Sequence, residues 1–137
     1  MKLCTDTITV FNKRIDAENG WDDYVPTIIT GVSWYCEIVS AVDNSGLHAA
    51  NRFTIRIPVD ADTSGKEYVD PVEYGAAEDA SELFTLANGD VVVKAEVDET
   101  GLQPADLKER YTDCFVILGV TDNRRAPNAP HFKVVGS

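Results

Sequence analysis

One run of oxygen-bearing side chains has the spacing of a metal-binding loop. Asp60, Asp62 and Ser64 alternate along the chain and Gly65 follows, as at the start of an EF-hand calcium loop. The twelfth position of such a loop should supply a bidentate glutamate, but Pro71 stands there. No helical pattern flanks the segment. We therefore interpret it as a solvated acidic loop, and keep Asp60, Asp62 and Ser64 as candidate metal ligands.

The residue types needed for nucleophilic catalysis are present, but in no pattern that such catalysis uses. The chain has two histidines, His48 and His131, and three cysteines, Cys4, Cys36 and Cys114. No G-x-S-x-G motif and no C-x-x-C pair occurs, so nucleophile–base and zinc sites have no support. The odd number and wide spacing of the cysteines favour reduced, partly buried thiols. We predict a non-enzymatic protein without catalytic residues or a cofactor.

Two adjacent arginines, Arg124 and Arg125, form a basic pair in a chain whose formal net charge is −11. With Asn123 they lie in a loop between two apolar runs. A single basic pair is too small for a nucleic-acid footprint, and the acidic remainder repels phosphate backbones and anionic membranes. We predict no sequence-specific nucleic-acid binding and no membrane association. The pair is either a solvated loop tip or a contact to an acidic neighbour, since arginine pairs bidentately with carboxylates.

Two aromatic residues extend the set of candidate interaction residues. The segment 12–26 is polar, and Asn19-Gly20 within it is a strong turn signal. Trp21 and Tyr24 follow that turn directly. We expect them to fold back as a lid on the edge of the domain, so they join Asn123, Arg124 and Arg125.

Alternating apolar and polar residues predict about six strands. In the segment 52–59, Phe53, Ile55, Ile57 and Val59 should face the core. The run 114–120 is apolar on both faces, which predicts a strand buried on both sides. The remaining strands are expected over 7–11 and 28–39, over 83–86 and 90–97 as one hairpin, and over 131–135 as the hairpin partner of 114–120.

One short helix is expected near 103–111, because Pro104 suits a first helical position and Asp106 favours the N-terminal end. One or two helical turns are also expected within 76–83. With few helices and no alternation of strands and helices, the fold class is all-β, a small antiparallel β-barrel or sandwich. The 137 residues correspond to a single domain over 1–137. No apolar run is long enough to span a bilayer, and the N-terminal MKLCTDTITV lacks the long apolar region of a signal peptide, so we expect neither feature.

Six short segments, spread over nearly the whole chain, form a pattern that is informative only when they are taken together. They are the strand ITVFN, the turn-rich G-W-D-D-Y, the strands V-S-W-Y, R-F-T-I-R-I-P and N-G-D-V-V-V, and the terminal hairpin V-T-D-N-R-R…P-H-F-K-V-V-G. Together they resemble a family of short, uncharacterised structural proteins of tailed phages or prophages of Gram-positive bacteria. More distantly, the layout is similar to phage head–tail adaptor and head-closure proteins.

This resemblance implies a non-enzymatic virion component, a head–tail connector that assembles as a ring between portal and tail. Its partners would be the portal, other neck or tail proteins and further copies, first in the host cytoplasm and then in the virion. Ring contacts are head-to-tail, so one face must complement another; the acidic segment 60–82 and the Arg124–Arg125 tip would be such faces. Two alternatives stay open: a soluble β-barrel module that binds a small ligand or sugar, and a metal-dependent enzyme using the Asp60 loop.

Overall fold

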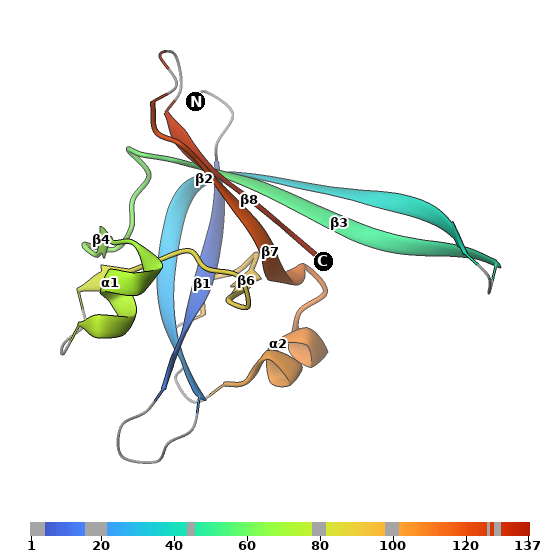
Figure 1. The fold of residues 1–137 in the computed structure, drawn as a ribbon, viewed down its shortest axis with the longest axis horizontal. Helices are drawn as coiled ribbons and strands as arrows, with labels where there is room; N and C mark the ends of the chain where they lie inside the picture. Colours follow the sequence, from blue (N-terminus) through green and yellow to red (C-terminus); the bar gives the residue numbers. More distant parts are fainter. Residues whose placement is uncertain are drawn as a thin grey trace.

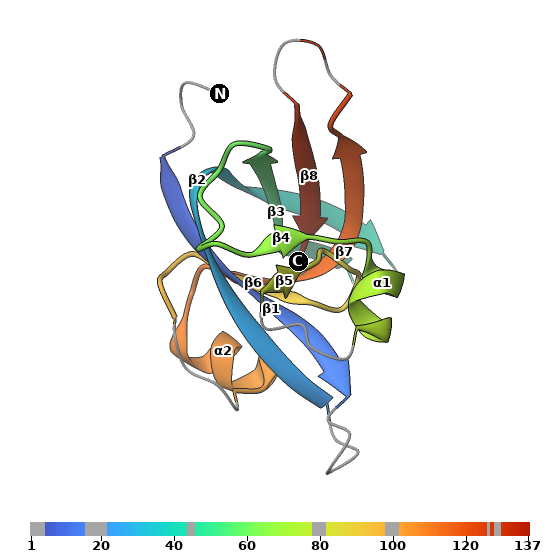
Figure 2. The same ribbon diagram turned by 90° about the vertical axis from the view of Figure 1, so that its left-hand side faces the viewer.

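Six antiparallel strands close into a barrel that forms the body of the molecule (Figures 1 and 2). The computed structural model describes residues 5–15, 22–43, 46–77, 82–97, 102–125, 127 and 130–137. The all-β prediction is confirmed. Around the barrel the strands follow the order β1 (Asp6–Ile15), β2 (Asp22–Asp43), β3 (Gly46–Pro58), β8 (His131–Gly136), β7 (Cys114–Asn123) and β6 (Val91–Val93).

Four short elements lie beside the barrel. Strands β4 (Glu67–Tyr68) and β5 (Leu83–Phe84) pair in parallel. Helix α1 (Pro71–Ala76) follows β4, and helix α2 (Pro104–Arg110) precedes β7. The second helix confirms the helix expected near 103–111. Neither helix of the described chain has the length and apolar character needed to cross a membrane.

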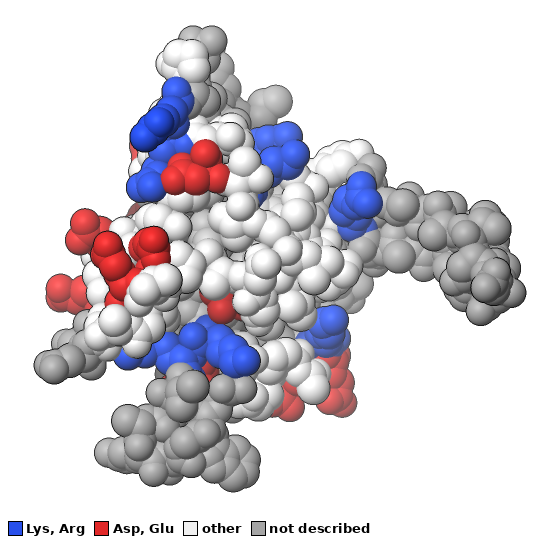
Figure 3. Space-filling view, in the orientation of Figure 1, with Lys and Arg blue, Asp and Glu red and all other residues white. Residues whose placement is uncertain are grey.

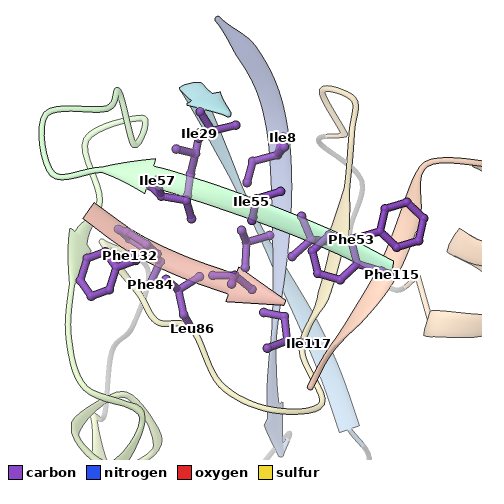
Figure 4. Packing of buried hydrophobic residues seen from close by; sticks show 14 residues of the cluster. Ile8, Ile29, Phe53, Ile55, Ile57, Phe84, Leu86, Phe115, Ile117 and Phe132 are labelled. Atoms are coloured by element: carbon purple, nitrogen blue, oxygen red, sulfur yellow. The ribbon is translucent and has the colours of Figure 1, made fainter. Parts of the chain in front are cut away.

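The barrel interior is filled by one cluster of buried side chains to which all six strands contribute (Figure 4). A second cluster packs α2 against the outer side of β6 and β7, with Leu107 at its centre. Because β6 lies between the two clusters, all three of its valines are buried and it has no polar face. The first cluster comprises Ile8, Val10, Ile29, Val32, Phe53, Ile55, Ile57, Phe84, Leu86, Val92, Phe115, Ile117, Phe132 and Val134.

The prediction that segment 114–120 is buried on both faces is right only for its first half. Cys114 packs under α2 while Phe115 and Ile117 face the barrel interior. Leu118, however, is 62% exposed. Because Phe115 and Ile117 face the interior, alternation points Leu118 outward, and the second cluster covers this outer side of β7 at Cys114 and Val116 but does not include Leu118. The register between β7 and β8 then shifts between Ile117 and Gly119, so that Val120 packs against the core. The predicted hairpin of this segment with 131–135 is confirmed.

Two sequence expectations about the irregular parts are wrong, and one strand pair is longer than expected. Within the polar segment 12–26, residues 12–15 and 22–26 pair with each other as the end of β1 and the start of β2. Strands β5 and β6 do not form a hairpin: β5 pairs with β4, and β6 with β1 and β7. Val59 is 52% exposed rather than inward, because β3 ends at Pro58.

The helical turns expected within 76–83 lie earlier in the chain, over α1. The Asp70 carboxylate accepts a hydrogen bond from the Val72 backbone N–H at 2.7 Å, and Pro71 occupies the first turn. An N-cap aspartate followed by proline is a standard helix start, so the signal was present in the sequence. Residues 78–81 of the expected helix lie outside the described residues.

A buried carboxylate ties the turn before β6 to β1. Asp90 is 2% exposed. Its carboxylate accepts hydrogen bonds from Asn12 Nδ2 at 2.8 Å, from the Lys13 backbone N–H at 3.1 Å and from the Ala87 backbone N–H at 3.2 Å. Burial raises the pKa of Asp90 in spite of these donors. The side chain of Asn12 also bridges to Thr85, so one polar network connects three segments.

Candidate functional site

The tip of the β7–β8 hairpin holds Arg124 in a fixed position. Its Nε–H donates to both carboxylate oxygens of Asp122 at 3.0 Å, and its Nη2–H donates to Oδ2 at 2.7 Å. These hydrogen bonds lower the pKa of Asp122 and raise the pKa of Arg124. The guanidinium carbon also lies 5.3 Å from the centre of the Tyr68 ring and 5.1 Å from that of Phe132. The side-chain conformation of Arg124 is thus fixed by contacts within the chain.

Three aromatic rings beneath this arginine join the hairpin to β4 and β5. The ring centres of Tyr68 and Phe132 are 4.4 Å apart, and those of Tyr68 and Phe84 are 5.7 Å apart. They line a groove with a volume of about 260 Å³. The other residues that line it are Ile57, Pro58, Val59, Ala61, Thr63, Lys66, Glu67 and Arg124.

A lysine forms one wall of this groove. The Lys66 ammonium donates to the Pro26 carbonyl oxygen and to Thr27 Oγ1, both at 2.9 Å. Burial lowers the pKa of Lys66. Both acceptors are neutral, so no carboxylate among them neutralises the ammonium. The Lys66 ammonium could therefore form an ion pair with a bound anion. The groove therefore combines an aromatic floor with two cations, Lys66 and Arg124.

Sequence reasoning missed Lys66, Tyr68 and Phe132 as parts of this site. The alternation of 131–135 places Phe132 inward, and Tyr68 is the natural anchor of its segment. No local pattern shows that residues 66–68 meet residues 124–132, because that contact depends on how the segment between β3 and β6 folds over the barrel.

Among the described residues, the others predicted to form an interaction site do not line the groove beside Arg124. Asn123 ends β7, and its Nδ2 lies 3.3 Å from His131 Nε2 on β8. Arg125 is exposed in the turn that follows. Tyr24 is not a lid: it lies within β2, is 7% exposed and packs in the second core cluster. Trp21 lies outside the described residues.

The candidate metal ligands instead attach a turn to the barrel. Ser64 Oγ donates to the Ile28 carbonyl oxygen at 2.8 Å, and the Ser64 backbone N–H donates to Asp62 Oδ1 at 3.0 Å. The backbone of Asp62 bridges to Thr30. Ser64 and Gly65 both have positive φ, at 58° and 80°, which makes a tight turn. Among the described residues, no three His, Cys, Asp or Glu side chains group so that they could hold a metal ion.

The described cysteines do not form a reactive site. Cys36 is exposed on β2 and Cys114 is buried against α2. Burial raises the pKa of the Cys114 thiol to about 11, so the thiol stays protonated near neutral pH.

Strands β2 and β3 continue beyond the barrel as a projecting arm, residues 37–52 (Figure 1). Strand β2 pairs with β1 only as far as Val32, and β3 pairs with β8 only from Phe53 onward. The register pairs from Glu37–Arg52 to Asp43–Gly46 therefore have no third strand beside them among the described strands. A two-stranded hairpin is marginally stable in water, and its open edges are ready to pair.

Comparison with known proteins gives one family. A family model described as a family of unknown function (DUF6751) matches residues 3–137. The match includes all six barrel strands, the arm and the β7–β8 hairpin. No curated protein and no solved structure matches the chain.

Proposed function

We propose that this chain, which belongs to the DUF6751 family, is a non-enzymatic structural protein of a tailed-phage virion. Its place would be the head–tail junction, as a connector that assembles as a ring between portal and tail. The resemblance of six sequence segments to phage structural proteins supports this role, and a closed barrel with a projecting arm is compatible with it.

The arm is the observation that carries the proposal. It extends on the side of the barrel away from α1 and β4 (Figure 1). Its paired strands continue past the last residues that pair with β1 and β8. The register pairs of the arm have no third strand beside them among the described strands, and such open edges are ready to pair. Docking on a neighbouring subunit would cover these open strand edges.

The tip of the β7–β8 hairpin would be a second contact. Asp122 occupies Nε and one hydrogen of Nη2 of Arg124, so the Nη1 edge can still donate to a carboxylate of a neighbour. Because Arg124 is already held by two rings and a carboxylate, little conformational entropy is lost when it binds. Arg125 adds a second, exposed cation. The acidic segment 60–82 of the adjacent copy is the expected partner.

Quantitative mass spectrometry of purified phage particles, or of induced prophage particles from the source strain, tests this proposal. We expect the chain in the particle, at low copy number and in a simple ratio to the portal protein. A high copy number would move it to the tail tube or capsid surface. Absence from the particles would refute the virion role.

The groove beside Arg124 favours a second candidate function, a binding module for a small anionic or sugar ligand. An aromatic floor with a few polar groups is typical of such sites. Its volume of about 260 Å³ is slightly below the usual range for ligand pockets, and the barrel interior is filled by side chains. Two-dimensional NMR titration with carboxylates and monosaccharides would test it. Ligand-dependent shifts confined to Lys66, Tyr68 and Phe132 would support it.

A further inference from the structure

The outer face of β3 and β8 carries two cations side by side. Arg56 on β3 is directly opposite Lys133 on β8, which places their Cβ atoms about 5 Å apart. Both side chains are partly buried. Like charges directly opposite each other destabilise a sheet, so this pair lowers the stability of the isolated chain.

No carboxylate stands beside these two charges in their row of the sheet. The next residues along the same row are Ser33 on β2 and Thr121 on β7, which are hydroxyl residues. Neither Arg56 nor Lys133 has an ion-pair partner within the described part of the chain. Two exposed apolar side chains lie on the same sheet, Tyr35 at 55% and Leu118 at 62% exposure. We call this outer surface of β2, β3, β8 and β7 the basic face.

A second surface has the opposite character. In the segment 59–77, five carboxylates are all exposed: Asp60, Asp62, Glu67, Asp70 and Glu73. It also carries the other two large hydrophobic residues that are exposed in the described chain, Val59 at 52% and Val72 at 79%. Figure 3 shows acidic side chains gathered on the side where Figure 1 places α1 and β4. We call this surface the acidic face.

We propose that the basic face of one copy of this chain docks on the acidic face of the next copy. Each surface pairs exposed apolar side chains with charges of one sign, apart from Lys66 in the acidic segment, which is partly buried and hydrogen-bonded to Pro26 and Thr27. The two surfaces are therefore complementary in both respects. A twofold contact of either surface with itself would bring like charges together. The contact is therefore head-to-tail, which is the type that closes into rings. The inference deepens the proposed function and rests on its ring assembly.

A nucleic acid is the other polyanion that could occupy the basic face. The chain as a whole carries a net charge of −11, which repels a phosphate backbone at long range. A second copy carries the same net charge and is also repelled at long range, so the choice between the two occupants depends on short-range complementarity. The acidic face also supplies apolar side chains that can cover Tyr35 and Leu118, whereas a phosphate backbone supplies none.

Two neutralising double variants of the full chain test the contact. Arg56→Gln/Lys133→Gln removes the cations of the basic face, and Glu67→Gln/Glu73→Gln removes carboxylates of the acidic face without touching the cap residue Asp70. The matched controls, Lys108→Gln/Arg110→Gln and Glu109→Gln/Asp113→Asn, make the same charge changes around α2. Sedimentation velocity from micromolar to millimolar concentration measures the association of each variant alone and of the two face variants mixed.

We expect the wild type and both controls to associate, and each face variant to associate roughly tenfold more weakly or less. The mixture should form dimers and nothing larger, because one intact basic face meets one intact acidic face. A wild type that stays monomeric, face variants that associate like the controls, or a mixture that stays monomeric beside an associating wild type would overturn the proposal.

Binding of a labelled single-stranded or duplex oligonucleotide that is lost in Arg56→Gln/Lys133→Gln would also overturn it, in favour of a phosphate ligand. The result of this association experiment can be distinguished from the result for the proposed virion role. Association through these faces together with absence from particles would refute only the virion role. Presence in particles without this association would refute only the contact.

Discussion

Replacing Gly136 by alanine should destabilise the barrel strongly, because the new methyl group has no room. A Cβ atom at this position would lie 2.2 Å from the Val116 carbonyl oxygen and 2.4 Å from Phe115 Cδ2. Gly136 does not have a positive φ, so the expected effect comes from space alone. The first of these neighbours is backbone and the second is a fully buried ring, so neither can move aside without disturbing β7.

The magnitude follows from what must move. Overpacking of a filled core costs about 1–3 kcal/mol. Separating β7 from β8 at this end would also weaken the two backbone hydrogen bonds between Val116 and Ser137, at 3.2 and 3.3 Å, each worth about 1 kcal/mol. We expect Gly136→Ala to lower the free energy of unfolding by roughly 3–5 kcal/mol. That is a large part of the 5–15 kcal/mol typical of a domain.

Urea denaturation followed by circular dichroism measures this loss, with Gly75→Ala as the control. Gly75 lies in α1, and a Cβ atom there would meet nothing within 4 Å. Its replacement should leave stability unchanged or raise it by up to about 1 kcal/mol, because alanine favours a helix over glycine. If Gly136→Ala unfolds at the wild-type midpoint with an unchanged slope, the packing of β8 against Phe115 described above is incorrect.

Four further predictions concern titration, the arm, the hairpin tip and the acidic loop. The raised pKa of Asp90 means that its contribution to stability is full below the unfolded-state pKa of about 3.9 and is lost as pH rises through the folded-state pKa. Denaturation of wild type and Asp90→Asn from pH 3 to 7 should show this change in the difference between them, and a pH-independent difference would refute it. Replacing residues 38–51 by a short glycine-containing turn should leave the barrel's unfolding free energy within about 1 kcal/mol of wild type, because the arm has no third strand, yet abolish assembly into particles; assembly by that variant would disprove the role of the arm. Charge reversal at Arg124 and Arg125 should block ring assembly and leave circular dichroism unchanged, since the Asp122–Arg124 pair is exposed and contributes little to folding, whereas normal particles would argue against a contact at the tip. Isothermal titration with Ca²⁺, Mg²⁺ or Mn²⁺ should give no binding heat, because Asp62 and Ser64 are used within their own turn; saturable heat that is lost in Asp60→Asn would restore the metal site.

Most of the barrel strands can be predicted from the sequence, because apolar and polar residues alternate along them as in a sheet with one buried face. Phe53, Ile55 and Ile57 were expected inward and are in the core. Helix α2 was expected from Pro104 and Asp106 and is present. These elements are set by local residue types, so a local pattern is enough to find them.

The position of other elements depends on contacts with distant parts of the chain, so the local sequence does not predict it. The sequence predicts a hairpin between 83–86 and 90–97, whereas β6 pairs with β1 and β7, which are distant along the chain. Tyr24 follows a turn signal, yet pairing between β1 and β2 draws it into the second cluster. Leu118 is exposed because the second cluster covers the outer side of β7 at Cys114 and Val116 and does not include Leu118, which no alternation within β7 predicts.

The distribution of charge has more functional meaning than its total. A net charge of −11 alone suggests a uniformly repulsive particle, and copies of such a particle would avoid one another. The fold instead places Arg56 opposite Lys133 on one sheet, and five exposed carboxylates lie in the segment 59–77. Segregation of this kind makes attraction directional, because contact of the proposed basic face with the acidic face of another copy is favourable, whereas contact of either face with itself is not. Raising the ionic strength should therefore weaken association, since these charges lie at the surface where salt screens them.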